Sequence, residues 1–158
     1  MRLTFPAVLI AALIVPCLAA SDPLGGSANS AYLAANAKKA GVVSMPGIQY
    51  QVLKHGNGPQ PSRSDCVTVN YKGSLINGKV FDQTKPGQSA TFRAGLLIPG
   101  WVEALQMMHV GDKWRLVIPA GLAYGRTGAG DGVIPPNQTL IFELELLKAE
   151  PAAQMGCG

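Results

Sequence analysis

The sequence predicts an α+β fold in which a twisted antiparallel β-sheet of five to six strands wraps around one short α-helix, with a short helical extension at the N-terminus. Two observations predict it. Apolar and polar residues alternate in several short runs, as they do in half-buried strands. Only one segment of the main part of the chain repeats its apolar residues at helical spacing. A chain of 158 residues, 47% of them hydrophobic, suits a single domain with a sizeable core.

Four segments share the alternation and are predicted as strands: 48–52, 67–71, 114–118 and 140–146. In the last of them, three leucines and Phe142 point to one face, whereas Glu143 and Glu145 point to the other. One buried and one solvated face are typical of an antiparallel sheet.

A tight hairpin is predicted at Asn77-Gly78, because this pair adopts positive φ at both central positions of a two-residue turn. The hairpin is expected to bring Phe81 and Asp82 to a strand end.

The central helix is predicted to begin at Pro99, since proline suits the first turn of a helix. Trp101, Leu105 and Met108 follow at helical spacing, and Gly111 is expected to end the helix. One helix laid across a twisted sheet leaves a cleft between the two.

Residues 1–20 are predicted to form a secretion signal peptide: Arg2 supplies a positive charge, segment 8–15 is apolar, and small residues precede Ser21. A membrane-anchoring helix is the alternative, but the apolar stretch is shorter than the ~20 residues that a spanning helix needs, and prolines flank it. The protein is therefore expected to cross the inner membrane and to reside in the periplasm or outside the cell.

The cysteines leave two questions open. Lipid attachment at Cys17 is a rival to signal cleavage, although the bulky residue before it departs from the small residue of lipobox motifs. An oxidising compartment allows Cys66 and Cys157 to pair, but nothing in their spacing demands a bridge. These cysteines with His55 or His109 have no recognisable ligand spacing, so no metal is expected.

The charges are typical of a solvated surface. Loss of residues 1–20 would lower the formal net charge from +4 to +3. The basic residues are spread along the chain, so no nucleic-acid partner is expected.

Two segments outside the sheet are expected to be flexible. The first is 21–46: its residues 21–29 are small and polar, and a short helix over 31–39 follows, which Ser30 caps and a glycine ends. This helix has few large apolar residues and is expected to dock weakly. Residues 151–158 are expected to be a flexible tail, which leaves 47–150 as the main domain.

Five of the ten aromatic residues of the chain fall into an ordered series of motifs: Tyr71, Phe81-Asp82, Ile98-Pro99-Gly100-Trp101, Ala123-Tyr124-Gly125, Ile134-Pro135-Pro136 and Phe142. No His, Cys or hydroxyl group stands where a nucleophile, general base or metal ligand would be expected. The series therefore predicts an apolar pocket.

This series resembles that of the FKBP-type peptidyl-prolyl cis-trans isomerases, in particular the bacterial macrophage-infectivity-potentiator branch, in which a segment like 47–53 leads into one like 67–73. The likeness covers roughly 31–150. It implies that 47–150 is an isomerase domain that acts on proline-containing peptides and unfolded proteins without a cofactor and binds macrolides of the rapamycin type. A monomer is expected, because the N-terminal helix is much shorter than the dimerising stalk of some relatives.

The resemblance also implies roles for single residues. Trp101 would be the pocket floor, and five residues would be its walls: Tyr71, Phe81, Leu97, Ile98 and Phe142. The backbone amide of Ile98 and the hydroxyl of Tyr124 would donate to substrate carbonyls. Asp82 would face the twisting amide, and Ile134 would cover the pocket from its loop.

The sequence departs from the family pattern beside the pocket. The connection 83–90 is short and lacks the arginine of many relatives, which leaves Lys85 or Arg93 as partners for Asp82. Ala90 stands where an aromatic residue is common, and Leu96 where a polar residue is common. Activity with an altered substrate preference is expected.

Other functions remain open at this point. The same pocket would serve a non-catalytic peptide-binding or chaperone module, and an inert structural domain is a third interpretation. The glycine-rich segment 125–132 does not suggest a phosphate site, because it runs into Ile134-Pro135-Pro136 rather than into a helix.

Overall fold

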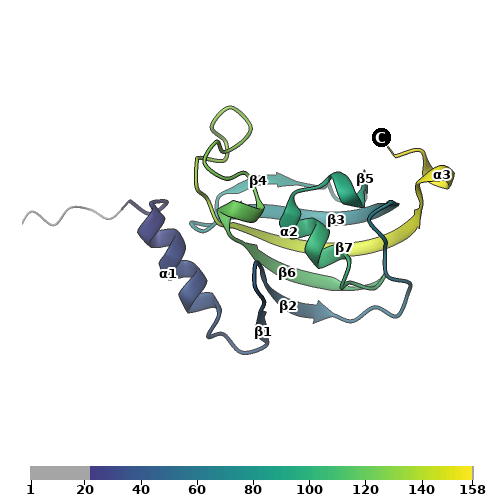
Figure 1. Ribbon diagram of the computed structural model, residues 1–158, viewed down its shortest axis with the longest axis horizontal. Coiled ribbons are helices and arrows are strands. Elements are labelled where there is room, and N and C mark those ends of the chain that lie inside the picture. Colours follow the sequence, from purple (N-terminus) through teal and green to yellow (C-terminus); the bar gives the residue numbers. More distant parts are fainter. Residues whose placement is uncertain (1–21, 158) are drawn as a thin grey trace, which may run out of the picture.

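The computed structural model describes residues 22–157; the predicted signal peptide and Cys17 lie outside the described residues. Seven strands form one antiparallel sheet in the order β1-β2-β6-β7-β3-β4, with β5 also paired to β3 (Figure 1). The strands are β1 (Val42–Ser44), β2 (Gln49–Lys54), β3 (Asp65–Leu75), β4 (Val80–Gln83), β5 (Ala90–Arg93), β6 (Lys113–Ile118) and β7 (Leu140–Pro151). The α+β prediction is confirmed. The sheet exceeds the predicted five to six strands because β1 and β5 are too short for an alternation to stand out.

In the part of the chain that the structure describes, three α-helices and two 3-10 turns complete the fold: α1 (Gly26–Asn36), η1 (Ala94–Leu96), α2 (Pro99–Leu105), η2 (Ala120–Leu122) and α3 (Ala152–Met155). The central helix α2 lies across one face of the sheet, as predicted, while α1 and α3 lie at opposite ends of the molecule (Figure 1). Within residues 22–157, none of the helices has the length and hydrophobicity that crossing a bilayer requires.

The core lies between α2 and the sheet. β3 and β7 pair over eleven positions, and their inward side chains meet the buried face of α2. A Cβ on Gly100 would lie 2.5 Å from Cγ2 of Ile118, so this glycine is what lets the first turn of α2 approach β6. The close approach fixes the height of Trp101 above the sheet.

The central helix ends earlier than predicted. It stops at Leu105, and the chain then turns towards Gly111, whose φ is +98°. The buried carboxylate of Asp112 accepts the amides of Gly56 at 2.6 Å and His109 at 2.7 Å. The bond from the His109 amide is a local alternative to further helical bonds, and the bond from the Gly56 amide ties the turn to the segment after β2, so apolar spacing alone overestimated the helix.

The predicted hairpin between β3 and β4 forms, but with a different turn. Gly78 has φ +86°, whereas Asn77 does not have a positive φ. The Gly78 amide donates to the Leu75 carbonyl at 2.9 Å, and Asn77 Oδ1 accepts the Lys79 amide at 3.0 Å. This is the longer hairpin in which one residue, a glycine, takes the left-handed position.

The N-terminal helix begins five residues before its predicted start. Asp22 Oδ1 accepts the Leu24 amide at 2.9 Å and its carbonyl accepts the Gly25 amide at 3.0 Å, which forms a turn that leads into α1. Ser30, predicted as the cap, lies inside the helix, and its predicted C-terminal lysines lie beyond the helix end at Asn36. The sequence prediction did not take account of this turn at Asp22, which lets the helix begin at Gly26.

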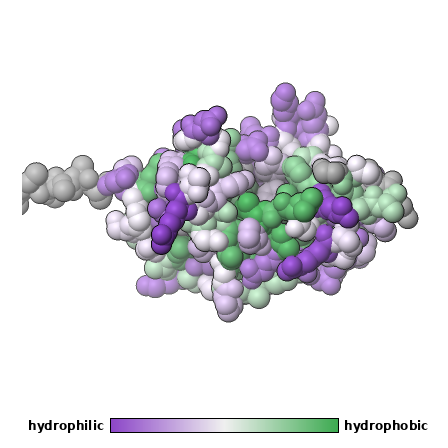
Figure 2. Space-filling model, turned by 45° about the horizontal axis from the view of Figure 1, so that its top comes forward, coloured by the Kyte–Doolittle hydropathy of each residue, from purple (hydrophilic) through white to green (hydrophobic). Residues whose placement is uncertain are grey.

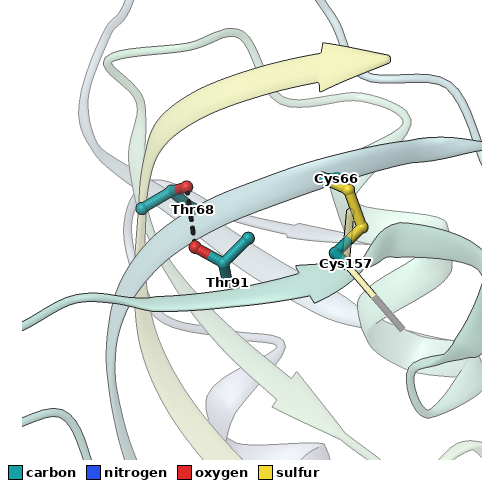
Figure 3. Close-up of a disulfide and its surroundings, with 4 residues drawn as sticks. All are labelled: Cys66, Thr68, Thr91 and Cys157. Carbon is teal, nitrogen blue, oxygen red and sulfur yellow. Dashed lines mark hydrogen bonds between the residues drawn. A yellow bond between two sulfur atoms is a disulfide. The ribbon is translucent and has the colours of Figure 1, made fainter. Parts of the chain in front are cut away.

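The predicted flexible tail is wrong as far as the structure describes it. β7 continues to Pro151, α3 follows, and Cys157 forms a disulfide with the fully buried Cys66 of β3 (Figure 3). Their Cα atoms are 5.9 Å apart, within the usual range for a disulfide. On the same face of β3, the hydroxyls of Thr68 and Thr91 are hydrogen-bonded at 3.0 Å and join β3 to β5 (Figure 3).

Candidate active site

A cavity of about 170 Å³ lies where α2 meets the sheet. Its lining residues are Tyr71, Asp82, Phe92, Leu97, Ile98, Trp101, Tyr124 and Phe142. The cavity is open to solvent, because Tyr124 is 39% exposed. A space-filling view shows a hydrophobic area over the middle of the molecule, bordered by hydrophilic residues (Figure 2).

The indole of Trp101 is the centre of an aromatic cluster. Tyr71, Phe142 and Phe92 meet it nearly edge-on, with ring centroids 5.3, 5.2 and 6.4 Å away. Such perpendicular pairs are favourable and hold the rings in fixed orientations. The indole is only 4% exposed, and within residues 22–157 its Nε1 has no hydrogen-bond partner. Trp101 is therefore the deeply buried aromatic side chain of the cavity lining.

Two phenols and one carboxylate form the polar side of the cavity. The hydroxyl of Tyr71 donates to Asp82 Oδ2 at 2.5 Å. β3 and β4 set this contact, because Asp82 pairs with Gly73, two residues from Tyr71. The predicted partners are not found: among the described residues, neither Lys85 nor Arg93 forms an ion pair with Asp82.

The environment holds both phenols in their protonated form. Burial raises the pKa of Tyr71, and the hydrogen bond to Asp82 and the charge of Asp82 raise it further. Burial also raises the pKa of Tyr124, again with a contribution from the charge of Asp82. Both hydroxyls are thus donors at neutral pH.

Ile98 offers a backbone donor at the edge of the cavity. It precedes α2, and its carbonyl accepts the amides of Trp101 at 2.9 Å and Val102 at 3.1 Å. Within the described residues, its own amide donates no hydrogen bond. Pro99 at the first helical position supplies no amide that would compete with it.

Phe81 and Ile134, both predicted at the pocket, do not line the cavity. Phe81 packs edge-on against Phe142 at 5.6 Å, behind the wall that Phe142 forms. Ile134 is 7% exposed and pairs with Ala129 within its own loop. The correction for Phe81 follows from a β-bulge: the pairing passes from Gly73–Asp82 to Ser74–Val80 and leaves Phe81 unpaired, so its ring packs against Phe142 while Asp82 reaches the cavity.

Phe92 lines the cavity but was missed. It lies on β5 and pairs with Val67 of β3. Ala90, Phe92 and Ala94 alternate with exposed residues in the structure, but β5 is only four residues long, and an alternation this short does not stand out in the sequence. Phe92 stands two residues after Ala90, the position where an aromatic residue is common in the family, and supplies an aromatic side chain to the cavity.

Larger hollows exist elsewhere but lack an aromatic cluster. One of about 270 Å³ lies between Tyr32 and the β3–β4 hairpin, and one of about 530 Å³ runs along α2 between Arg63 and Gln106. No group of three or more His, Cys, Asp or Glu side chains in residues 22–157 is arranged to hold a metal ion.

Comparison with known proteins identifies relatives. A family model described as FKBP-type peptidyl-prolyl cis-trans isomerase matches residues 58–147. The outer membrane protein MIP of Legionella longbeachae is 50% identical over 125 residues, which cover 78% of this chain and 53% of that protein. The FKBP-type 22 kDa peptidyl-prolyl cis-trans isomerase of Escherichia coli is 52% identical over 119 residues, covering 74% and 57%. The chain spans about half the length of the curated relatives it matches.

Solved structures agree with these relatives. FkpA from Escherichia coli superposes with a TM-score of 0.76 at 45% identity, covering 80% of this chain and 59% of that one. A peptidyl-prolyl cis-trans isomerase from Pseudomonas syringae pv. tomato has a TM-score of 0.73 at 42% identity, covering 78% and 92%. The fold, the aromatic cavity and the family match over more than half of its length all agree, and the chain belongs to the family of FKBP-type peptidyl-prolyl cis-trans isomerases.

Proposed function

We propose that the protein accelerates rotation about Xaa-Pro peptide bonds in proteins that fold outside the cytoplasm. Unaided, this rotation crosses a barrier of ~18–20 kcal/mol and takes tens to hundreds of seconds. The twisted transition state has less charge separation between nitrogen and carbonyl oxygen than the planar amide has. An apolar enclosure therefore destabilises the ground state more than the transition state. The observation that carries the proposal is the aromatic cavity above Trp101.

The cavity suits a proline ring. Its volume of about 170 Å³ is several times the ~30 Å³ that a water molecule occupies in the liquid. We assign Trp101 to the floor beneath the ring and Tyr71, Phe92 and Phe142 to the walls. Phe81 supports Phe142 from behind instead of contacting the substrate.

Two donors are available to substrate carbonyls. The free amide of Ile98 lies at one side of the cavity, and the hydroxyl of Tyr124 projects from the loop after η2. Bonds to both would fix the peptide on either side of the rotating amide. Fixed orientation is a general source of rate acceleration.

Asp82 is assigned to the twisting amide itself. The Tyr71 hydroxyl holds its carboxylate in place at 2.5 Å, so Asp82 does not need to reorganise during rotation. No covalent bond and no proton transfer are required of the lining residues.

The required stabilisation is moderate. Each tenfold acceleration corresponds to about 1.4 kcal/mol, so an acceleration of ~10⁴ to 10⁵ requires about 6–7 kcal/mol. Desolvation of the amide, fixed orientation and two hydrogen bonds are together sufficient for an effect of this size.

The disulfide supports a location outside the cytoplasm. Disulfides persist in oxidising compartments and are rare in the cytosol, and Cys66 and Cys157 are bonded here. Together with the predicted signal peptide, this supports secretion across the inner membrane. Macrolides of the rapamycin type are proposed as inhibitors that occupy the proline position.

Exchange between the cis and trans forms of a proline-containing peptide, followed by NMR, tests the proposal. Micromolar protein is expected to accelerate exchange well above the blank, and Tyr124→Phe or Asp82→Val to reduce the acceleration. A rate equal to that of the blank would refute the proposed function. The alternative is a peptide-binding module. In that case the unmodified protein, Tyr124→Phe and Asp82→Val would suppress aggregation of an unfolded client equally well, and none of them would accelerate isomerisation.

A further inference from the structure

The N-terminal helix is attached to the protein through buried asparagines. Asn29 and Asn36 are the buried residues of α1, with 5% and 1% of their surface exposed. Burying an amide is unfavourable unless its polar atoms find partners. The partners of the two asparagines therefore define what α1 is fixed to.

Asn29 joins α1 to the beginning of β7. Its Oδ1 accepts the backbone amide of Thr139 at 2.7 Å, and its Nδ2 donates to the carbonyls of Leu24 at 2.9 Å and Gly25 at 3.1 Å. Thr139 is only 2% exposed, so water cannot replace this bond without an opening of the structure. One side chain thus holds the start of α1 and the start of β7 together.

Gln138 forms a second link between the same segments. Its Nε2 donates to the carbonyls of Leu24 and Pro136, both at 3.0 Å, and its side chain is buried. The carbonyl of Leu24 therefore accepts from both Asn29 and Gln138. Leu24 in turn packs against the hydrophobic core.

These links reach the loop that carries Tyr124, here called the Tyr124 loop (residues 120–139). The Asn137 amide donates to the Gly125 carbonyl at 2.7 Å and closes the loop directly before Gln138. At the other side of this closure, the Gly125 amide donates to the Ala120 carbonyl at 2.9 Å. The beginning of α1 (purple) lies near the base of this loop (green) in Figure 1. Hydrogen bonds thus continue from α1 to the residue beside Tyr124.

We infer that α1 is a positioning element of the active site, in which Asn29 and Gln138 hold the base of the Tyr124 loop so that the Tyr124 hydroxyl stays at the cavity. The inference rests on the proposed function of Tyr124 as a donor to substrate. Asn29 does not line the cavity, and its side-chain hydrogen bonds go to Leu24, Gly25 and Thr139, so it is a positioning residue.

The two asparagines supply a matched pair of variants. Asn36 lies at the other end of α1, where its Nδ2 donates to Gln49 Oε1 at 2.9 Å and its Oδ1 accepts from Arg115 at 3.1 Å. Asn29→Ala is expected to lower kcat/KM for isomerisation about tenfold, since small displacements of catalytic groups have effects of this order, and to speed amide exchange in 124–137. Asn36→Ala is expected to loosen α1 without either change. Equal effects of the two variants, or none, would overturn the inference.

A double-mutant cycle separates positioning from a general loss of structure. If Asn29 acts through Tyr124, adding Asn29→Ala to Tyr124→Phe changes kcat/KM little, because the donor is already absent. If Asn29→Ala lowers kcat/KM by the same factor in both backgrounds, the residue does not act through Tyr124 and the inference fails.

If the Asn29→Ala variant does not fold, amide exchange in the unmodified protein tests the link between α1 and Thr139 instead. The Thr139 amide is expected to exchange together with the amides of α1, as one cooperative unit. Fast exchange throughout α1 with Thr139 as protected as the centre of β7 would overturn the inference. An unmodified protein without isomerase activity would instead refute the proposed function, and the exchange experiment would still decide whether α1 holds the loop.

Discussion

Trp101 and Trp114 are the two tryptophans of the chain, and both are nearly buried, with 4% and 5% exposed. Only Trp101 borders the cavity, whereas Trp114 stacks on Tyr50 with ring centroids 4.3 Å apart. The same substitution at the two positions therefore separates a loss of packing from a loss of the site.

Trp101→Leu and Trp114→Leu are each expected to lower the free energy of unfolding by about 2 kcal/mol, measured by denaturant titration. Trp101→Leu is also expected to lower kcat/KM about a hundredfold, because the proline ring loses its floor. Trp114→Leu should retain kcat/KM. Similar kinetics in the two variants would show that Trp101 only packs the core.

The phenols of the cavity are expected to ionise late. Tyrosine outside a fold has a pKa of about 10, and burial with the nearby Asp82 raises the pKa of Tyr71 and Tyr124. Above pH ~10 the unfolded chain loses these protons before the folded protein does, so their contribution to stability is complete below this pH and is lost as the pH rises. An absorbance titration should show a late ionisation that Tyr71→Phe and Tyr124→Phe each reduce. Ionisation of all tyrosines in one step near pH 10 would contradict this assignment.

At the residue scale, the sequence predicted most of the residues that line the cavity. It did not predict Phe92 or the residues that hold the Tyr124 loop in place. Trp101, Tyr71 and Phe142 could be assigned because the family motifs contain them. Phe92 was missed because its strand is four residues long. Asn29 could not be found at all, because its partner Thr139 is 110 residues away and no local pattern connects them.

At the scale of elements, the packing of the Phe81 and Phe142 rings against β3 depends on one small residue, Gly73. A Cβ on Gly73 would lie 2.6 Å from the Phe81 ring and 2.8 Å from the Phe142 ring. β3 can therefore carry no side chain at this position without moving both phenylalanines.

Gly73→Ala is expected to lower the free energy of unfolding by about 1–3 kcal/mol, as overpacking does, and to lower kcat/KM because Phe142 is displaced into the cavity. Gly26→Ala is the control, since nothing lies within 4 Å of a Cβ there; it should not lower either quantity. Thermal melts and isomerisation kinetics measure both effects. Unchanged kinetics in a folded Gly73→Ala protein would contradict the placement of Phe142.

The elements that sequence predicted well are those with a long, regular alternation. β7 and β3 pair over eleven positions, and their period is visible in the sequence. The bounds of α1 and α2 were predicted less well, because hydrogen bonds of Asp22 and Asp112 to backbone amides start one helix early and turn the chain after the other. Such side-chain bonds compete with helical ones but leave no periodic signal.

At the scale of the whole molecule, the disulfide joins the segment after β7 to the beginning of β3. Cys66 and Cys157 are 91 residues apart in sequence. The sequence left this bond open, because the path of the chain after β7 determines the distance between the two cysteines. The structure brings them together through the extension of β7 and the turn at α3.

Cys157→Ser is expected to lower the free energy of unfolding by about 2–4 kcal/mol, because a closed loop of this length restricts the unfolded chain. Neither cysteine lines the cavity, so kcat/KM should stay near that of the unmodified protein. Denaturant titrations with and without a reductant measure the effect. A transition midpoint that a reductant leaves unchanged would show that the bond does not stabilise the protein.

The central claim for the molecule is that an aromatic cavity eases rotation of a prolyl amide without transferring a proton or forming a bond. The most direct test is kcat/KM for isomerisation, measured in H₂O and in D₂O from about pH 6 to about pH 9, where catalysis by a proton-transferring group would show titration. The account predicts a clear acceleration over the blank that is the same in both solvents and constant across this range. No acceleration, or one that is slower in D₂O and follows the titration of a single group, would contradict it.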